Sequence, residues 1–255
     1  MKSDIAVVLV TVCRDTLYRA IRSIFRQDFE GTIHVLIGVD KELFGSIDKI
    51  MADLALECPP RITLTCIHPG YSTSARHGGV HSCWFGGSLR TALTFLAASE
   101  LVAYLDDDDW YQPEHLRLLH RAAQGKSWAF TLSNFADPNF NRILGPDTIE
   151  SLGPGRGLFN ESFGGFVRPS ALVLNKLKLS HLLHLWSTSP NPEGDAEDRV
   201  LFQHLLRYPD YGETGVPTVN CALDPTDILH GLRMMSLGLP ATPGAPKIQS
   251  LRPPS

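Results

Sequence analysis

Apolar residues recur along the chain with two different periods. Continuous apolar runs, typical of strands covered on both faces, occupy 5–10, 32–39, 61–67, 100–105 and 127–135. Segments with apolar residues three or four positions apart, typical of amphipathic helices, occupy 14–27, 43–58, 85–99, 113–124 and 195–208. Alternating strands and helices predict an α/β fold: an open, mostly parallel sheet with right-handed connections, flanked by helices.

The pattern weakens in two places. Between Asp137 and Gly165 prolines and glycines interrupt it, which predicts a hairpin and a long loop, a small antiparallel addition to the sheet. Residues 239–255 contain five prolines and one glycine, a composition typical of a disordered tail. We therefore expect a single domain at 1–238 followed by a disordered segment.

Composition excludes several classes of protein. The 255 residues are 43% hydrophobic with a formal charge of -4, which gives no footprint for nucleic acid or for an anionic membrane. The five cysteines form no C-x-x-C pair, so we expect neither disulfides nor a cysteine zinc site. Free cysteines favour a cytoplasmic location.

The first residues are typical of a strand rather than of a signal peptide, and no run approaches the ~20 apolar residues of a membrane span. Any membrane contact is expected to be peripheral, and nothing indicates the oligomeric state.

Four aspartates, Asp106 to Asp109, follow the apolar run at 100–105 directly. They are expected at the carboxyl end of a strand, where open α/β sheets bind ligands. Adjacent carboxylates repel one another, so the cluster needs a neutralising cation. Residues i and i+2 of an extended chain point the same way, so Asp106 and Asp108 can share an oxygen-liganded Mg²⁺ or Mn²⁺. The alternative is an acidic turn that caps the next helix, which needs only one aspartate.

The segment "YLDDDDW" resembles the Asp-x-Asp motif of nucleotide-sugar glycosyltransferases with the GT-A fold, especially family 2. The resemblance implies a Rossmann-like GT-A fold, with Asp106 and Asp108 flanking a divalent metal bound to a nucleoside diphosphate. It also implies that a late histidine completes the metal shell, here His230 in "DILHGLRMMS". Asp107 is left for a basic partner, and Asp109 for the turn and the following helix.

Further landmarks of that family occur in the same order. The resemblance implies that the turn after the first strand faces the nucleotide, although the family's usual proline is absent here. It also implies that Asp40 contacts the uracil or ribose. Arg90, in "GGSLRTAL", is expected to pair with Asp107 or with a phosphate. The residues expected to contact the nucleotide or the donor are Thr11, Val12, Arg14, Asp40, Arg90, Asp106, Asp107, Gly165 and Glu197.

The segment "GDAEDRVLF" resembles the family's Glu-Asp motif, in which Asp198 is the catalytic base. A helix N-terminus favours ionised carboxylates, but acidic residues in a first turn are also ordinary capping chemistry. Gly164 and Gly165 would let the backbone approach the donor sugar or the acceptor. The 68–87 loop is expected to be mobile and to cover the donor. Gly78 and Gly79 argue against a helical metal pair made by its histidines.

Together these features predict a metal-dependent, hexosyltransferase-like enzyme. It would move a sugar from a nucleoside diphosphate sugar, with UDP favoured, to a hydroxyl of a saccharide or lipid-linked acceptor, with inversion, in polysaccharide or glycoconjugate biosynthesis. Two alternatives remain. One is a sugar-1-phosphate nucleotidyltransferase, disfavoured because "TVCRDT" has no glycine to hold a triphosphate. The other is a catalytically silent nucleotide- or sugar-binding protein.

Overall fold

The structure, a computed structural model, describes residues 2–240. Its main sheet has nine strands in the order β3-β2-β1-β4-β10-β6-β11-β5, with β7 paired to β6, and β8 and β9 form a second, two-stranded sheet. The strands are β1 Ile5–Thr11, β2 Ile33–Val39, β3 Ile62–Ile67, β4 Leu101–Tyr104, β5 Trp110–Tyr111, β6 Trp128–Asp137, β7 Arg142–Pro146, β8 Gly153–Pro154, β9 Gly165–Phe166, β10 Leu172–Asn175 and β11 Gly212–Ala222. The helices are α1 Thr16–Phe25, α2 Ile47–Glu57, α3 Gly87–Leu96, α4 His115–Ala122, α5 Asn160–Phe163, α6 Glu197–Leu205 and α7 His230–Ser236, with 3-10 helices η1 Ala75–His77, η2 Pro169–Ala171 and η3 Ser180–Ser187.

The first half of the sheet is parallel throughout. Strand β1 pairs with β2 on one side and β4 on the other, and β2 pairs with β3. Every residue of β2 and β4 is buried, because helices cover both faces of these strands. The continuous apolar runs therefore predicted these four strands correctly.

The second half is mixed. Strand β10 lies antiparallel between β4 and β6, and β11 runs parallel to β6. Strands β5 and β7 add antiparallel edges. The expected hairpin is formed by β6 and β7, and the long loop after it contains β8, α5 and β9. The predicted α/β class, with a mostly parallel sheet and a small antiparallel addition, is confirmed.

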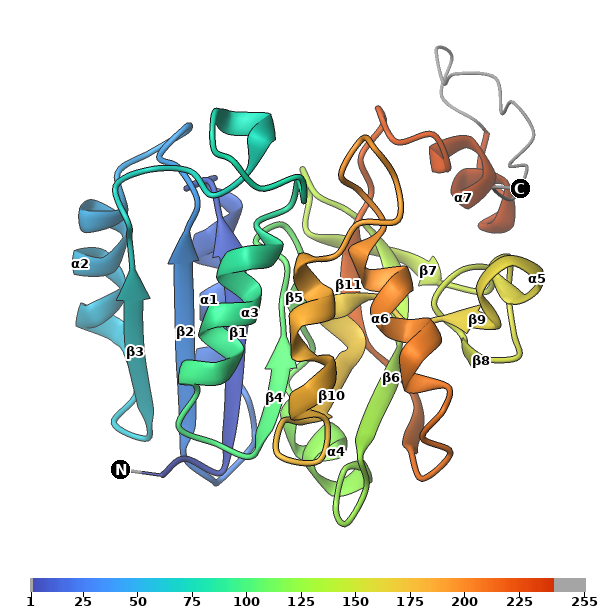
Figure 1. Cartoon of the computed structure of the whole chain (residues 1–255), viewed down its shortest axis with the longest axis horizontal. Helices are drawn as coiled ribbons and strands as arrows, with labels where there is room; N and C mark the ends of the chain where they lie inside the picture. Colours follow the sequence, from blue (N-terminus) through green and yellow to red (C-terminus); the bar gives the residue numbers. More distant parts are fainter. Residues whose placement is uncertain (1, 241–255) are drawn as a thin grey trace.

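Helices cover both faces of the sheet. Figure 1 shows α3 and α6 in front of the strands and α1 behind them. Helix α3 approaches β2 closely because Gly38 has no side chain; a Cβ there would lie 2.7 Å from Leu93 Cδ1. It also packs against η3, where a Cβ on Gly87 would lie 2.0 Å from the carbonyl oxygen of Trp186. These close contacts fix the start of α3 over the end of the sheet.

The carboxyl ends of the parallel strands meet at one edge, the upper edge in Figure 1. Residues 68–86, the segment before α6 and the segment before α7 all lie at this edge. Within residues 2–240 no helix is long and apolar enough to span a bilayer. Of the expected disordered tail, 241–255 lies outside the described residues.

Candidate functional site

The turn after β1 is tied to the aspartate cluster. Thr11 Oγ1 donates to Asp107 Oδ2 over 2.7 Å, and Arg14 Nη1 donates to Asp107 Oδ1 over 2.5 Å. Cys13 holds a left-handed backbone with φ of 62°, and its N–H donates to Thr11 Oγ1 over 2.9 Å. The carbonyl of Val12 accepts from the backbone of Leu43 over 3.1 Å. The turn thus presents Arg14 to the end of the neighbouring strand β4.

The four aspartates alternate in exposure. The side chains of Asp106 and Asp108 are 35% and 48% exposed, whereas that of Asp107 is 4% exposed. Asp109 is buried as well. The cluster therefore has two outward and two inward carboxylates, as expected, but residues 106–109 form a turn, closed by the Asp109 N–H on the Asp106 carbonyl, and not the extended chain assumed.

Arg90 lies above this cluster on α3. Its Nη2 donates to Asp106 Oδ1 over 2.7 Å, and its guanidinium lies 4.9 Å from the ring centre of Trp186. The expected pairing of Arg90 with Asp107 is therefore wrong. In the turn formed by residues 106–109, Asp106 faces α3, while Asp107 faces the β1 turn and takes Arg14 as its basic partner.

Asp109 points into the protein rather than toward the next helix. It accepts hydrogen bonds from Ser170 Oγ over 2.7 Å and from the N–H of Ala222 over 3.0 Å. Its expected helix-capping role is wrong: its backbone N–H closes the turn onto Asp106, but its side chain joins η2 to β11. Burial, followed by repulsion from Asp106, raises the pKa of Asp109.

Asp108 has the fewest partners in the cluster. Within residues 2–240 its carboxylate makes no hydrogen bond, and its one ion pair is a 3.8 Å contact with Arg14. Desolvation, then repulsion from the three other aspartates, raises the pKa of Asp108 above its ordinary range. A cation bound at this carboxylate would relieve that repulsion.

The residues present fit a cation that also binds phosphate. No group of three or more His, Cys, Asp or Glu side chains within 2–240 forms a complete metal cage. Magnesium commonly uses one or two protein carboxylates and takes its other ligands from substrate phosphates and water, and Asp106 and Asp108 supply such a pair of outward oxygen ligands. His230 is the first residue of α7 and is 4% exposed. Hydrogen bonds from the backbone and hydroxyl of Thr226 lower the pKa of Asp224, which precedes α7. A place for His230 in a metal shell stays a prediction.

Asp40 is at the end of β2, as expected, and is saturated with donors. Its carboxylate accepts from Ser72 Oγ over 2.8 Å, from the Thr73 N–H over 3.0 Å and from Thr73 Oγ1 over 3.1 Å, and lies 2.9 Å from His77 Nδ1. Burial opposes ionisation, but these hydrogen bonds outweigh it and lower the pKa of Asp40. Asp40, Thr73, His77 and Ser88 also border an open depression of about 810 Å³.

The Glu-Asp pair begins α6, directly after Ala196, which has a left-handed φ of 64°. Glu197 is 3% exposed, and burial together with repulsion from Asp198 raises its pKa to about 7. Asp198 Oδ1 accepts from the Arg199 N–H over 2.8 Å, and burial raises the pKa of Asp198. The positive charge of Arg90 acts on both carboxyl groups. Arg90 therefore links this pair to Asp106.

Gly164 follows α5 directly and Gly165 begins β9; both have a positive φ, 74° and 109°. A Cβ on Gly165 would lie 2.3 Å from the carbonyl oxygen of Gly153, and one on Gly164 would lie 2.6 Å from Leu206 Cδ1. Both glycines are thus needed for packing of the chain against itself. Contact with a donor or an acceptor stays a prediction.

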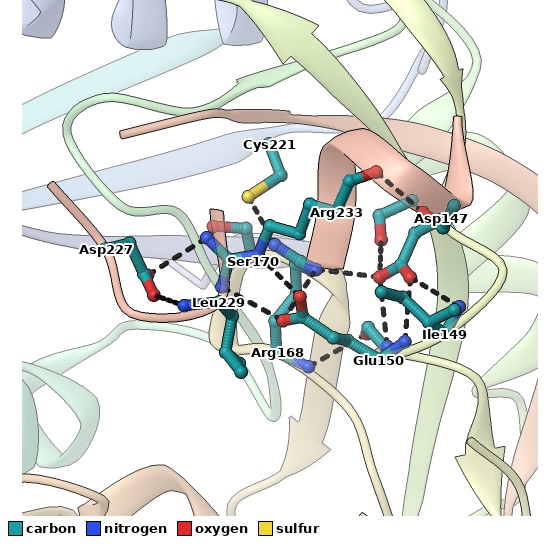
Figure 2. A network of polar contacts seen from close by, with 12 residues as sticks. Asp147, Ile149, Glu150, Arg168, Ser170, Cys221, Asp227, Leu229 and Arg233 are labelled. Atoms are coloured by element: carbon teal, nitrogen blue, oxygen red, sulfur yellow. Dashed lines mark hydrogen bonds and ion pairs between the residues drawn. The ribbon is translucent and has the colours of Figure 1, made fainter. Parts of the chain in front are cut away.

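A buried charged network lies beside Ser170, the residue that donates to Asp109, and no local sequence pattern indicated it. Figure 2 shows Arg168 paired with Asp147, and Arg233 with Glu150 and Asp227. Arg168 donates to Asp147 over 2.8 Å, and Arg233 donates two hydrogen bonds, of 2.5 and 3.1 Å, to Glu150. The network joins the loop after β7 to α7, the helix that begins at His230.

Comparisons with known proteins agree with this architecture. No protein-family model matches the sequence, and no curated protein matches it significantly. Solved structures of S. aureus TarS, a GT-A-type glycosyltransferase, do match. One TarS structure matches with a TM-score of 0.62 and 14% identity, over 93% of this chain and 41% of that chain. TarS 1-349 in complex with UDP-GlcNAc matches with a TM-score of 0.61 and 13% identity, over 93% of this chain and 68% of that chain.

The chain has the GT-A fold. A third structure, TarS 1-349 in complex with UDP, matches over 93% of this chain and 67% of that chain, with a TM-score of 0.59 and 13% identity. The chain therefore spans about two fifths of the longer TarS chain. In this GT-A fold the aspartate cluster, Arg14 and the Glu-Asp pair all lie at the carboxyl edge of the sheet, the edge at which α/β sheets bind ligands.

Proposed function

We propose that the chain is a glycosyltransferase that moves a sugar from a nucleoside diphosphate sugar, with UDP favoured, to an acceptor hydroxyl. The observation that carries the proposal is the division of the strand-end aspartates, in which Asp106 and Asp108 face outward beside two arginines. The complexes of the TarS structures with UDP and UDP-GlcNAc support the choice of donor.

Arg14 and Arg90 are the groups that bind the diphosphate in this proposal. Their guanidinium groups pair with Asp107 and Asp106 in the protein alone, so both are already held at the sheet edge before substrate arrives. Planar guanidinium groups favour bidentate contacts with phosphate oxygens. Mg²⁺ or Mn²⁺ held by Asp106 and Asp108, with His230 as a further ligand, would supply charge neutralisation for the leaving diphosphate.

Asp198 is the proposed base. One oxygen, Oδ1, accepts from the Arg199 N–H, and Oδ2 makes no hydrogen bond within residues 2–240. In the reaction the acceptor oxygen forms a bond to the anomeric carbon, the bond from that carbon to the diphosphate breaks, and the bonding pair leaves with the nucleoside diphosphate. The acceptor proton goes to Asp198. Attack from the face opposite the diphosphate inverts the anomeric carbon.

Slow hydrolysis of the donor tests this function without a known acceptor. UDP release is measured from UDP-glucose, UDP-galactose and UDP-GlcNAc with Mn²⁺ present. Asp108→Ala is expected to reduce release by about a hundredfold, because it removes charge stabilisation at the leaving group. The matched control is Asp53→Ala, which removes an exposed aspartate on α2. Undiminished turnover in Asp108→Ala, or no release from any donor, contradicts the proposal.

A catalytically silent nucleotide-binding protein is the second candidate. It is favoured by the pairing of Asp106 and Asp107 with arginines and by the saturation of Asp40 with donors. Isothermal titration of UDP with and without Mn²⁺ separates the two. Equal binding in both conditions, together with no donor hydrolysis, favours the silent protein.

A further inference from the structure

Two neighbouring aromatic side chains at the site edge are exposed without an evident structural reason. Trp84 and Phe85 are 37% and 50% exposed, whereas Trp128 and Trp186 are 1% exposed. Single exposed apolar residues are normal on proteins. Here, however, two large rings are adjacent in the sequence and lie in the segment between η1 and α3, at the carboxyl edge of the sheet.

A third side chain joins the two rings into one surface. The guanidinium carbon of Arg76 lies 5.5 Å from the centre of each ring, within the range of a cation–π contact. Arg76 is exposed and forms no ion pair with any carboxylate of residues 2–240. We call Arg76, Trp84 and Phe85 the aromatic platform.

The backbone of the platform is fixed to the segment that leads into the Glu-Asp pair. The N–H of Trp84 donates to the carbonyl of Gly194 over 2.7 Å, and Ser74 Oγ donates to the carbonyl of Trp84 over 3.1 Å. Gly194 permits this approach, because a Cβ there would lie 1.9 Å from the carbonyl oxygen of Ser82. Only three residues separate Gly194 from Asp198, so the backbone of Trp84 is bonded to the segment that leads directly into the proposed base.

The same loop also binds Asp40, the residue expected to contact the nucleoside. Ser72, Thr73 and His77, which lie on both sides of Arg76 in the sequence, bind Asp40, and the depression that they border is lined by no residue of the platform. A nucleoside at that depression would leave the platform uncovered. The platform therefore lies where the second substrate must approach.

We propose that the aromatic platform is the acceptor subsite and that its occupant is a saccharide ring. This inference rests on the proposed function and adds the chemical class of the acceptor. The C–H face of a sugar ring packs on an aromatic ring, while its hydroxyl groups remain free to bond with a neighbouring polar group such as Arg76. A saccharide held on Trp84 and Phe85 would extend one hydroxyl toward Asp198.

Saccharide binding can be measured without any donor. Saturation-transfer NMR with maltotetraose, cellotetraose and chitotetraose as probes is compared for the wild type and the variants Trp84→Ala, Trp84→Phe, Phe85→Ala and Phe95→Ala. Loss of one stacked ring is expected to weaken binding about tenfold in Trp84→Ala. Trp84→Phe should restore much of that loss. Phe95→Ala, which removes another exposed phenylalanine of the same region of sequence, should bind as the wild type does.

The proposal is overturned if the wild type binds none of the three probes, or if Trp84→Ala binds as tightly as Phe95→Ala. A sedimentation assay with phosphatidylglycerol–phosphatidylcholine vesicles is run in parallel. If Trp84→Ala loses vesicle binding and keeps saccharide binding, the platform is a membrane contact and the acceptor proposal is wrong. Donor hydrolysis is measured separately in the wild type and in Trp84→Ala. If the wild type hydrolyses no donor, the proposed function is contradicted, whatever the saccharide probes show.

Discussion

His77 Nδ1 lies 2.9 Å from Asp40 Oδ2, which fastens the 68–86 loop to the end of β2. The same carboxylate also holds Ser72 and Thr73, so one residue closes the loop at three points. A nucleoside that bonded to Asp40 would have to replace at least one of these donors.

Removing this carboxylate is therefore expected to release the loop. In Asp40→Ala the Thr73 N–H loses its acceptor, and its hydrogen-exchange rate should rise about tenfold or more at constant global stability. Exchange mass spectrometry of peptides from residues 68–86 measures this. Asp48→Ala, which removes an exposed aspartate on α2, is the control. Equal exchange in both variants would show that other contacts hold the loop.

The two outward aspartates and the inward Asp109 should differ in their effect on metal binding. Asp108→Asn is expected to weaken the binding of Mn²⁺ in the presence of UDP by about tenfold or more, since it removes a charged oxygen ligand. Asp109→Asn should instead lower the free energy of unfolding, because Ser170 and Ala222 lose a charged acceptor. Titration calorimetry and urea unfolding give the two quantities. If Asp109→Asn weakens Mn²⁺ binding as much as Asp108→Asn, the division of sides is wrong.

Arg90 should contribute to stability as well as to the site. Its side chain is 6% exposed, so Arg90→Met leaves Asp106 without its partner and removes the contact with Trp186. We expect a loss of about 2 kcal/mol in the free energy of unfolding, less than a fully buried pair would give, because Asp106 is about one third exposed. Arg117→Met breaks an exposed pair with Asp28 and should cost less than about 1 kcal/mol. Equal losses in urea unfolding would contradict this role.

Glu197 gives the protein a pH dependence of known sign. Burial and Asp198 raise its folded-state pKa to about 7, above the unfolded value, so ionisation disfavours the folded state. The free energy of unfolding should therefore fall as pH rises from about 5 to 7. Glu197→Gln should reduce this slope, whereas the exposed Glu161→Gln should retain it. A smaller slope of the same sign remains in Glu197→Gln, because burial also raises the pKa values of Asp108, Asp109 and Asp198. Urea unfolding at pH 5, 6, 7 and 8 measures the difference. The same slope in wild type and Glu197→Gln would assign the dependence to another group.

The buried pair of Glu150 and Arg233 should behave as a coupled unit. Glu150→Leu leaves Arg233 buried with Asp227 alone and is expected to cost about 3 kcal/mol. The double variant Glu150→Leu/Arg233→Met should cost less than the sum of the two single changes, because it leaves no unpaired charge from this pair. Chemical unfolding of the four proteins completes the cycle. Additive losses would mean that the contacts drawn in Figure 2 do not couple these residues.

Local sequence patterns predicted the elements that are periodic and contiguous. Strands β1 to β4 and helices α1 to α3 follow from their apolar runs and helical spacing. Asp106 and Asp108 are both exposed, as expected, but residues 106–109 form a turn rather than the extended chain from which that expectation came. Local spacing could not predict the partner of Asp107, because which arginine reaches an inward carboxylate depends on the neighbouring strand.

The second half of the sheet was harder to predict for a physical reason. Strand β10 has four residues and β5 has two, too short for a period to be recognised. Arg168 and Arg233 look like surface residues in sequence, because burial of arginine requires carboxylates that come from distant segments. Asp40 was expected to contact the nucleotide. Sequence spacing did not indicate that residues 72–77 would fold back and donate hydrogen bonds to its carboxylate.

Strand β10 determines when the two halves of the sheet can join. It enters antiparallel between β4 and β6, which are not paired with each other, although it is later in the chain than both. Until Leu172–Asn175 has been synthesised, strands β1 to β4 and the hairpin of β6 and β7 present open edges to solvent and to other chains. Such late insertion raises the sequence separation of the contacts that close the sheet, which slows folding. A fragment that ends before Leu172 should therefore aggregate, even though it contains the whole aspartate cluster.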